Sequence, residues 1–214
     1  MQRPWHPARA RPPVLKGTTT VGLRLRNHVV LGADRRATAG YYVAHKHVKK
    51  IVKLTDYMAM TTAGLVADAQ VLAEWVRTRA RLYEMETRKR MPVSVAANLL
   101  ASILLTSRRQ YFMPYFVQLI LGGYDTAPRL YSLDLYGTIT EERYIATGSG
   151  SVTAIGLIED EYDENMPVEK AVDLVRRAIL SSIRRDAFTG NGIDVVVIGP
   201  KGIIEKSFEV KAKF

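Results

Sequence analysis

Three consecutive threonines follow a glycine in the segment Gly17-Thr18-Thr19-Thr20-Val21-Gly22 and are the clearest candidate nucleophiles in the chain. A threonine hydroxyl is a weak nucleophile, so it needs a neighbouring base that takes its proton. Threonines before an apolar strand are also common simply because β-branched side chains suit strands. The tripeptide alone is therefore compatible with a catalytic role and with a purely structural one.

The bases that usually activate such a hydroxyl are scarce. The absence of cysteine excludes a disulfide scaffold, a thiolate metal site and a cysteine nucleophile. His45 and His47 would share a face if their segment is a strand, but two imidazoles are too few for a typical zinc site, and we expect no metal. No histidine accompanies a carboxylate in a Ser-His-Asp type of motif. A free α-amine could act instead, since its pKa of roughly 8 is close to neutral pH. Cleavage before Thr18 would place that amine and the hydroxyl on one residue.

The segment before Thr18 has the composition of a removable leader. Residues 1–17 contain four prolines and four basic residues, with no acidic residue. Such a segment has too little apolar surface to offset its ordering entropy, and it lacks the apolar core of a secretory signal peptide. We therefore expect residues 1–17 to be a propeptide and residues 18–214 to form one domain.

Strand and helix patterns occur in blocks along that domain. Alternation predicts strands over 18–26, 29–34, 50–54, 58–62, 116–122, 130–134, 142–146, 193–198 and 203–208. Helical spacing predicts helices over 66–86, 92–109 and 152–159 and from Pro167 onward. The first two would bury apolar stripes comprising Ala69, Leu72, Trp75, Val76 and Tyr83, and Val95, Leu99, Ile103 and Leu104. Blocks of this kind indicate an α+β fold with antiparallel sheets, and no apolar run is long enough to span a membrane.

The Gly17-Thr18 junction resembles the processing junction of archaeal-type 20S proteasome β subunits, which are N-terminal nucleophile hydrolases. Further family-like segments recur in order over almost all of 18–208: Gly32-Ala33-Asp34-Arg35-Arg36, Lys49-Lys50-Ile51, Thr62-Ala63-Gly64-Leu65, Ala67-Asp68-Ala69-Gln70, Met113-Pro114-Tyr115, Gly122-Gly123-Tyr124-Asp125, Thr147-Gly148-Ser149-Gly150-Ser151 and Arg185-Asp186. The resemblance implies a four-layer αββα sandwich, with two antiparallel sheets between helix pairs. It also implies a threonine endopeptidase that releases its own propeptide by autocatalytic cleavage between Gly17 and Thr18.

The same resemblance implies catalytic roles for residues around Thr18. Thr18 would be the nucleophile, with its freed amine as the general base. Lys50 would lower the pKa of the Thr18 hydroxyl, and Asp34 would hold Lys50 in place. The adjacent Lys49 would point to the opposite face of a strand, so only one of the two lysines can reach the site.

The resemblance also implies a set of supporting groups. The backbone N–H of Gly64 would stabilise the oxyanion, and a residue without a Cβ permits the close approach of a substrate carbonyl. Ser149, Asp186 and Thr189 would form hydrogen bonds around the Thr18 amine. Most family members have serine where this chain has Thr189, which keeps the hydroxyl, so we expect activity to be retained.

The positions that match the primary substrate pocket of the family are uncharged: Ala37, Val48, Val52, Thr62 and Val66. They predict an apolar, chymotrypsin-like preference. The segment 148–151 is rich in glycine and serine but lacks the lysine of a phosphate-binding loop, so we expect no nucleotide or other cofactor.

By resemblance, β subunits of this type form seven-membered rings stacked between rings of α subunits. We therefore expect α subunits and homologous β subunits as partners, unfolded proteins as substrates, an ATP-dependent regulator that acts through the α ring, and a cytoplasmic location. Nucleic acid and membranes are not expected as partners.

Two other functions remain open. The chain could be a structural β subunit without activity, although such subunits lose the threonine, the lysine or the aspartate, and this chain retains all three. A basic nucleic-acid-binding module is suggested by the net charge of +10. Without residues 1–17 the charge is +6, from 27 basic against 21 acidic residues, and it is spread as mixed-sign pairs instead of forming one basic stripe.

Overall fold

The first sheet contains the hairpin that the alternating pattern predicts at the start of the domain. The computed structural model describes residues 17–40, 42–111 and 114–210. Strand β1 (Thr20–Arg24) pairs antiparallel with β2 (Val29–Asp34), with Thr20 opposite Ala33. The complete order is β10-β1-β2-β11-β12, in which the added strands are β10 (Tyr144–Thr147), β11 (Ile193–Gly199) and β12 (Gly202–Phe208).

The second sheet is an antiparallel meander in the order β5-β6-β7-β8-β9. Its strands are β5 (Ile51–Lys53), β6 (Met58–Gly64), β7 (Val117–Tyr124), β8 (Pro128–Leu133) and β9 (Ile139–Glu141). A separate short hairpin is formed by β3 (Ala37–Ala39) and β4 (Tyr42–His45). The sequence patterns did not predict β3, β4 or β9, because three or four residues are too few to display a reliable alternation.

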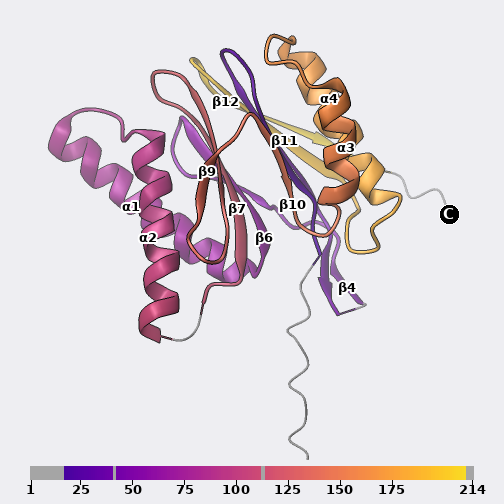
Figure 1. Ribbon diagram of the computed structural model, residues 1–214, viewed down its shortest axis with the longest axis horizontal. Helices are drawn as coiled ribbons and strands as arrows, with labels where there is room; N and C mark the ends of the chain where they lie inside the picture. The colour runs from indigo at the N-terminus through magenta and orange to yellow at the C-terminus, as the bar shows by residue number, and fades with distance from the viewer. Residues whose placement is uncertain (1–16, 41, 112–113, 211–214) are drawn as a thin grey trace, which may run out of the picture.

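Four helices cover the outer faces of the two sheets: α1 (Val66–Thr87), α2 (Val93–Tyr111), α3 (Ser151–Glu161) and α4 (Val168–Ile183). In Figure 1 the layers appear side by side, with α1 and α2 on the left, the two sheets in the middle, and α3 and α4 on the right. The expected α+β, four-layer αββα sandwich of the N-terminal nucleophile hydrolase type is confirmed.

Strand β2 shows how the layers are joined. Val30 packs into the cluster beneath α3 and α4, whereas its neighbours Val29 and Leu31 pack between the two sheets. This division follows from the strand geometry, since successive side chains point to opposite faces. The cluster between the sheets is completed by Ala59, Ile120, Leu130, Val196 and Ile198. The sheets thus pack face to face through one apolar layer.

Two residues that the helical spacing placed in buried stripes lie on the exposed faces of their helices, and for them the prediction was wrong. Trp75 of α1 is 49% exposed and Val95 of α2 is 41% exposed. The buried face of α1 consists mainly of small residues, Ala69, Leu72, Ala73, Val76 and Ala80. The predicted stripe contains Ala69 but not Ala73 or Ala80, and such small side chains allow the helix to lie close to the sheet. In α4 the apolar residues Val172, Val175 and Ile179 recur at helical spacing and are buried.

The proposed boundary between propeptide and domain remains a prediction, because residues 1–16 lie outside the described residues. The same applies to Met113 of one family-like segment and to residues 211–214. Gly17 and Thr18 are described, and both are buried.

Candidate active site around Thr18

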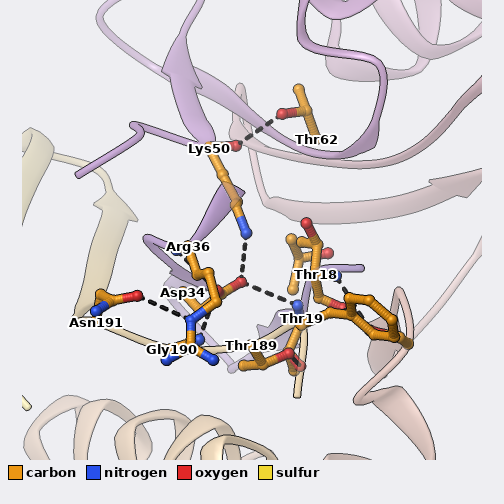
Figure 2. Close-up of polar contacts among 12 residues, drawn as sticks. Thr18, Thr19, Asp34, Arg36, Lys50, Thr62, Thr189, Gly190 and Asn191 are labelled. Atoms are coloured by element: carbon orange, nitrogen blue, oxygen red, sulfur yellow. Dashed lines mark hydrogen bonds and ion pairs between the residues drawn. The ribbon is translucent and has the colours of Figure 1, made fainter. Parts of the chain in front are cut away.

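A fully buried carboxylate, Asp34, organises the candidate site at the end of β2. Its Oδ1 accepts the Lys50 Nζ at 2.7 Å and the backbone N–H of Thr19 at 3.0 Å. Its Oδ2 accepts the backbone N–H groups of Arg36 at 3.0 Å and Gly190 at 2.9 Å. Figure 2 shows these contacts converging on Asp34. These four donors satisfy both oxygens of a carboxylate that is buried away from solvent.

Lys50 is the lysine that reaches Asp34, as the sequence predicted. Its side chain is 4% exposed, whereas that of Lys49 is 81% exposed and lies 3.7 Å from Glu205 on the surface. Burial lowers the pKa of the Lys50 ammonium below its ordinary value, and the charge and hydrogen bond of Asp34 oppose that shift. In Figure 2 the Lys50 side chain extends toward Asp34, with Thr18 to one side. Lys50 and Asp34 therefore form an ion pair that is shielded from solvent.

Thr18 lies directly before β1 and is 4% exposed. In the uncut chain its nitrogen is a peptide N–H, which donates to Ser149 Oγ at 3.2 Å. The Ser149 hydroxyl donates in turn to Asp186 Oδ2. The structure thus brings the predicted residues Ser149 and Asp186 to the nitrogen that cleavage would convert into an amine.

The hydroxyl of Thr189 joins the same carboxylate and extends the chain to Thr19. Thr189 Oγ1 donates to Asp186 Oδ2, and it lies 2.8 Å from Thr19 Oγ1. A hydroxyl has one proton, so Thr189 cannot donate to Asp186 and to Thr19 at once. Thr19 must therefore be the donor in that pair. Because the hydroxyls of Ser149 and Thr189 both donate to Asp186, each hydrogen bond in this network has a defined direction.

Two glycines allow the backbone to pass close to Thr18 and to the expected oxyanion position. Gly148 has φ +88°, and a Cβ there would lie 2.1 Å from the carbonyl oxygen of Thr18. Gly64 has φ +118°, and a Cβ there would lie 2.1 Å from the carbonyl oxygen of Phe116. Both positions are in the region of φ that favours glycine, so both need glycine for conformation and for space. Gly64 ends β6, next to the helix α1.

Of the five expected pocket residues, Thr62 and Val48 form hydrogen bonds with Lys50 and Arg35, which lie in or next to the site. Thr62 is buried, and its Oγ1 and backbone N–H both donate to the Lys50 carbonyl, at 3.3 and 2.9 Å. Val48 N–H donates to the Arg35 carbonyl at 3.0 Å. A hollow of about 350 Å³ borders Gly17, Gly64 and Ser149, but none of Ala37, Val48, Val52, Thr62 and Val66 lines it. The five positions therefore stay a prediction for the pocket.

Sequence reasoning missed three contributors: Thr19, Arg36 and Gly190. The Arg36 guanidinium donates to the Ala187 carbonyl at 2.7 Å and to Asn191 Oδ1 at 2.8 Å, which ties the loop after α4 to the end of β2. The contact of the Gly190 N–H with Asp34 has no signal in a single sequence. Thr19 could have been suspected from its place beside Thr18.

Among the residues that the structure describes, no group of three histidine, cysteine, aspartate or glutamate side chains is placed to hold a metal ion. Within the same residues, none of the helices combines the length and apolar character needed to cross a bilayer.

Comparison with known proteins places this geometry in context. The family model described as proteasome subunit matches residues 14–198. The chain is 61% identical to proteasome subunit beta 2 of Hyperthermus butylicus over 96% of both chains. It is 55% identical to proteasome subunit beta 2 of Ignicoccus hospitalis over 92% of this chain and 91% of that protein. It is 47% identical to proteasome subunit beta 1 of Saccharolobus islandicus over 94% of this chain and 93% of that protein.

Proposed function

Because this chain belongs to the proteasome subunit family, we propose that it is a catalytic β subunit of a 20S core and that Thr18 is its nucleophile. The observation that carries the proposal is the buried ion pair of Lys50 and Asp34. Asp34 also accepts a hydrogen bond from the backbone N–H of Thr19. A buried ion pair is an expensive arrangement for stability alone. Its position beside Thr18, visible in Figure 2, supports a catalytic purpose.

The proposed reaction is peptide-bond hydrolysis through an ester. Thr18 Oγ attacks the scissile carbonyl carbon while its proton passes to the freed Thr18 amine, and the oxyanion accepts the Gly64 N–H. The amine then gives the proton to the leaving nitrogen as the C–N bond breaks. Water, deprotonated by the same amine, attacks the ester and releases Thr18. The lysine charge favours each anionic stage. The Ser149 hydroxyl holds the amine and is itself positioned by Asp186, which also accepts the Thr189 hydroxyl.

We propose that the same hydroxyl releases the propeptide. In the uncut chain, Thr18 Oγ would attack the carbonyl carbon of Gly17, and the acyl group would move from nitrogen to oxygen. Hydrolysis of that ester would release residues 1–17 and leave the amine on Thr18. The domain of the mature subunit would then be 18–214.

The family also supports proposals for assembly and substrates. We propose that the subunit forms seven-membered β rings between α rings and degrades unfolded proteins inside the chamber, with an ATP-dependent regulator acting through the α ring. The uncharged residues Ala37, Val48, Val52, Thr62 and Val66 favour cleavage after apolar side chains. No cofactor enters the reaction, and we expect a cytoplasmic particle.

The test is to assemble the chain and its Thr18→Ala variant with α subunits. Intact mass should decrease by residues 1–17 in the original chain and stay unchanged in the variant. Fluorogenic peptides with apolar, basic or acidic residues before the cut should be hydrolysed by the original chain only, fastest after apolar residues. Retention of residues 1–17 in assembled particles would instead indicate a structural, inactive subunit.

A further inference from the structure

The residue before the proposed cut, Gly17, is packed so tightly that its missing side chain has a structural reason. A Cβ on Gly17 would lie 1.9 Å from Phe188 Cβ and 2.5 Å from Phe188 Cγ. It would also lie 2.7 Å from Ser149 Oγ. Distances below about 3 Å between such carbon atoms do not occur without a shift of one partner. The space where a side chain would begin is therefore filled by Phe188.

Rotation of the Phe188 ring cannot relieve this overlap. The closest atom is Phe188 Cβ, whose position is set by the backbone and not by a side-chain torsion. The Phe188 N–H donates to Asp186 Oδ1 at 3.1 Å, which anchors the backbone at this residue. Only a movement of the segment itself would make room.

That segment is anchored to the active site on both sides of Phe188. The Ala187 carbonyl accepts the Arg36 guanidinium at 2.7 Å. The Thr189 hydroxyl contacts Asp186 and Thr19, and the Gly190 N–H donates to Asp34 at 2.9 Å. A shift of Phe188 would thus disturb the groups proposed to activate Thr18. The obstacle is rigid because it is part of the same network.

We propose that Phe188 is a specificity-determining residue for the self-cleavage and that it admits only glycine at position 17. This inference rests on the proposed cleavage before Thr18. The side-chain direction of Gly17 points to Phe188 and Ser149, neither of which is among the five residues expected for the substrate pocket. The propeptide and a peptide substrate therefore present their residue before the cut differently. Self-cleavage is restricted to glycine, while substrates with large side chains can use the pocket.

The test follows propeptide release by intact mass over time in the full chain assembled with α subunits. Gly17→Ala should slow release by about 10- to 100-fold, the range expected for forcing one carbon into a filled space. Gly17→Val should be comparably slow, because the first carbon already meets the obstacle. A limit set by the size of the substrate pocket would instead leave Gly17→Ala near the original rate, and that result would overturn the proposal.

Replacements of Phe188 separate its Cβ from its ring. Combining Gly17→Ala with Phe188→Gly should restore release to within about 3-fold of Phe188→Gly alone, because the two closest atoms are gone. The remaining one, Ser149 Oγ at 2.7 Å, ends a short side chain that can move by a few tenths of an ångström. Gly17→Ala with Phe188→Ala should stay slow, because the Cβ at 1.9 Å remains. No rescue by Phe188→Gly, where that single variant itself releases the propeptide, would overturn the proposal.

Two controls make failure interpretable. Thermal unfolding of each variant with Thr18→Ala reports folding without cleavage, and if Phe188→Gly does not fold, the Gly17→Ala rate alone decides as stated. Failure of the original chain to release residues 1–17 would overturn both this inference and the proposed function. Normal release by the original chain and by Gly17→Ala would overturn this inference only.

Discussion

At Asp34, one buried carboxylate accepts four hydrogen bonds, one of them from its cationic partner Lys50. Two of these donors come from its own neighbourhood in the chain, Arg36 and Thr19, and one comes from Gly190, more than 150 residues away. The residue therefore joins the start of the domain to its last third. Its burial makes the charge of Lys50 dependent on it, since an unpaired buried ammonium is strongly disfavoured.

Replacing Asp34 by asparagine should therefore destabilise the fold and abolish peptide hydrolysis. Removing one partner of a buried ion pair costs about 3–5 kcal/mol. The matched control is Glu205→Gln, which removes the partner of the exposed neighbour Lys49 and should cost about 0–1 kcal/mol. Chemical unfolding of the two variants in a Thr18→Ala background measures both values. Equal costs would contradict the role given to Asp34.

The deficit of Asp34→Asn should shrink as the pH rises. Burial already lowers the Lys50 pKa, and Asp34 opposes that shift, so loss of the carboxylate lowers it further. Between that lowered pKa and the ordinary value of 10.5, the unfolded chain binds more protons than the folded one, so the free energy of unfolding increases with pH. The deficit measured at pH 7 should exceed the one at pH 9.5, and Glu205→Gln should show no such trend.

At the scale of elements, the site lies where loops at the strand ends of the first sheet meet Gly64 of the second and Lys50, which directly precedes its strand β5. Strand β1 carries Thr20 opposite Thr147 of β10, so the loop from Gly148 to Gly150 begins directly beside Thr18. The loop after α4 brings Asp186 and Thr189 to the same place. Loops can position these groups because β1, β2 and β11 are paired neighbours that define where each loop starts.

Gly148→Ala should shift the backbone next to Thr18 and so disturb the candidate active site. Its φ of +88° and the contact of 2.1 Å with the Thr18 carbonyl oxygen both disfavour a Cβ. We expect a loss of more than about 1 kcal/mol in stability and a loss of most activity. Gly156→Ala in α3 is the matched control, because no atom lies within 4 Å of its added Cβ, and it should gain about 0.5–1 kcal/mol. Thermal unfolding and peptide hydrolysis measure both, and an active, stable Gly148→Ala would refute the argument.

At the scale of the whole molecule, the inward apolar faces of the sheets and helices pack against one another. Helix α1 also has an apolar stripe on its solvent-exposed face. Val71, Trp75, Leu82 and Met85 are 42–78% exposed and recur at helical spacing along α1. An exposed stripe of this kind is typical of a contact with another protein. Since this family assembles into the proteasome core, we expect the stripe to be covered by a neighbouring subunit.

Trp75→Glu should therefore weaken assembly and leave the isolated fold intact. Its side chain is 49% exposed, so the substitution should change stability by less than about 0.5 kcal/mol. Gln70→Glu adds the same charge to the exposed surface of the same helix and is the control. Native mass measurements with α subunits should show fewer complete particles for Trp75→Glu alone. Full assembly of Trp75→Glu would mean that the stripe is not an interface.

Much of the fold could be predicted because its signals are local. The long strands, all four helices and the α+β class follow from alternation, helical spacing and the order of blocks, and the family resemblance added the αββα arrangement. The short strands β3, β4 and β9 escaped, as did the outward position of Trp75, because a helix can bury either an alanine face or an aromatic face and only packing against the sheet decides.

The sequence by itself determined which chemistry was available. Without cysteine and without a suitable histidine, and with a proline-rich leader ending at Gly17-Thr18, a freed threonine amine was the best base on offer. The family resemblance singled out Lys50 over Lys49, since alternation along a strand says only that one of the two can reach the site. Only the tertiary structure decided that Thr19, Arg36 and Gly190 complete the surroundings of Asp34, and that Phe188 fills the space beside Gly17. The physical reason is that these contacts join residues up to 171 positions apart through loop geometry, and no local pattern encodes such a distance.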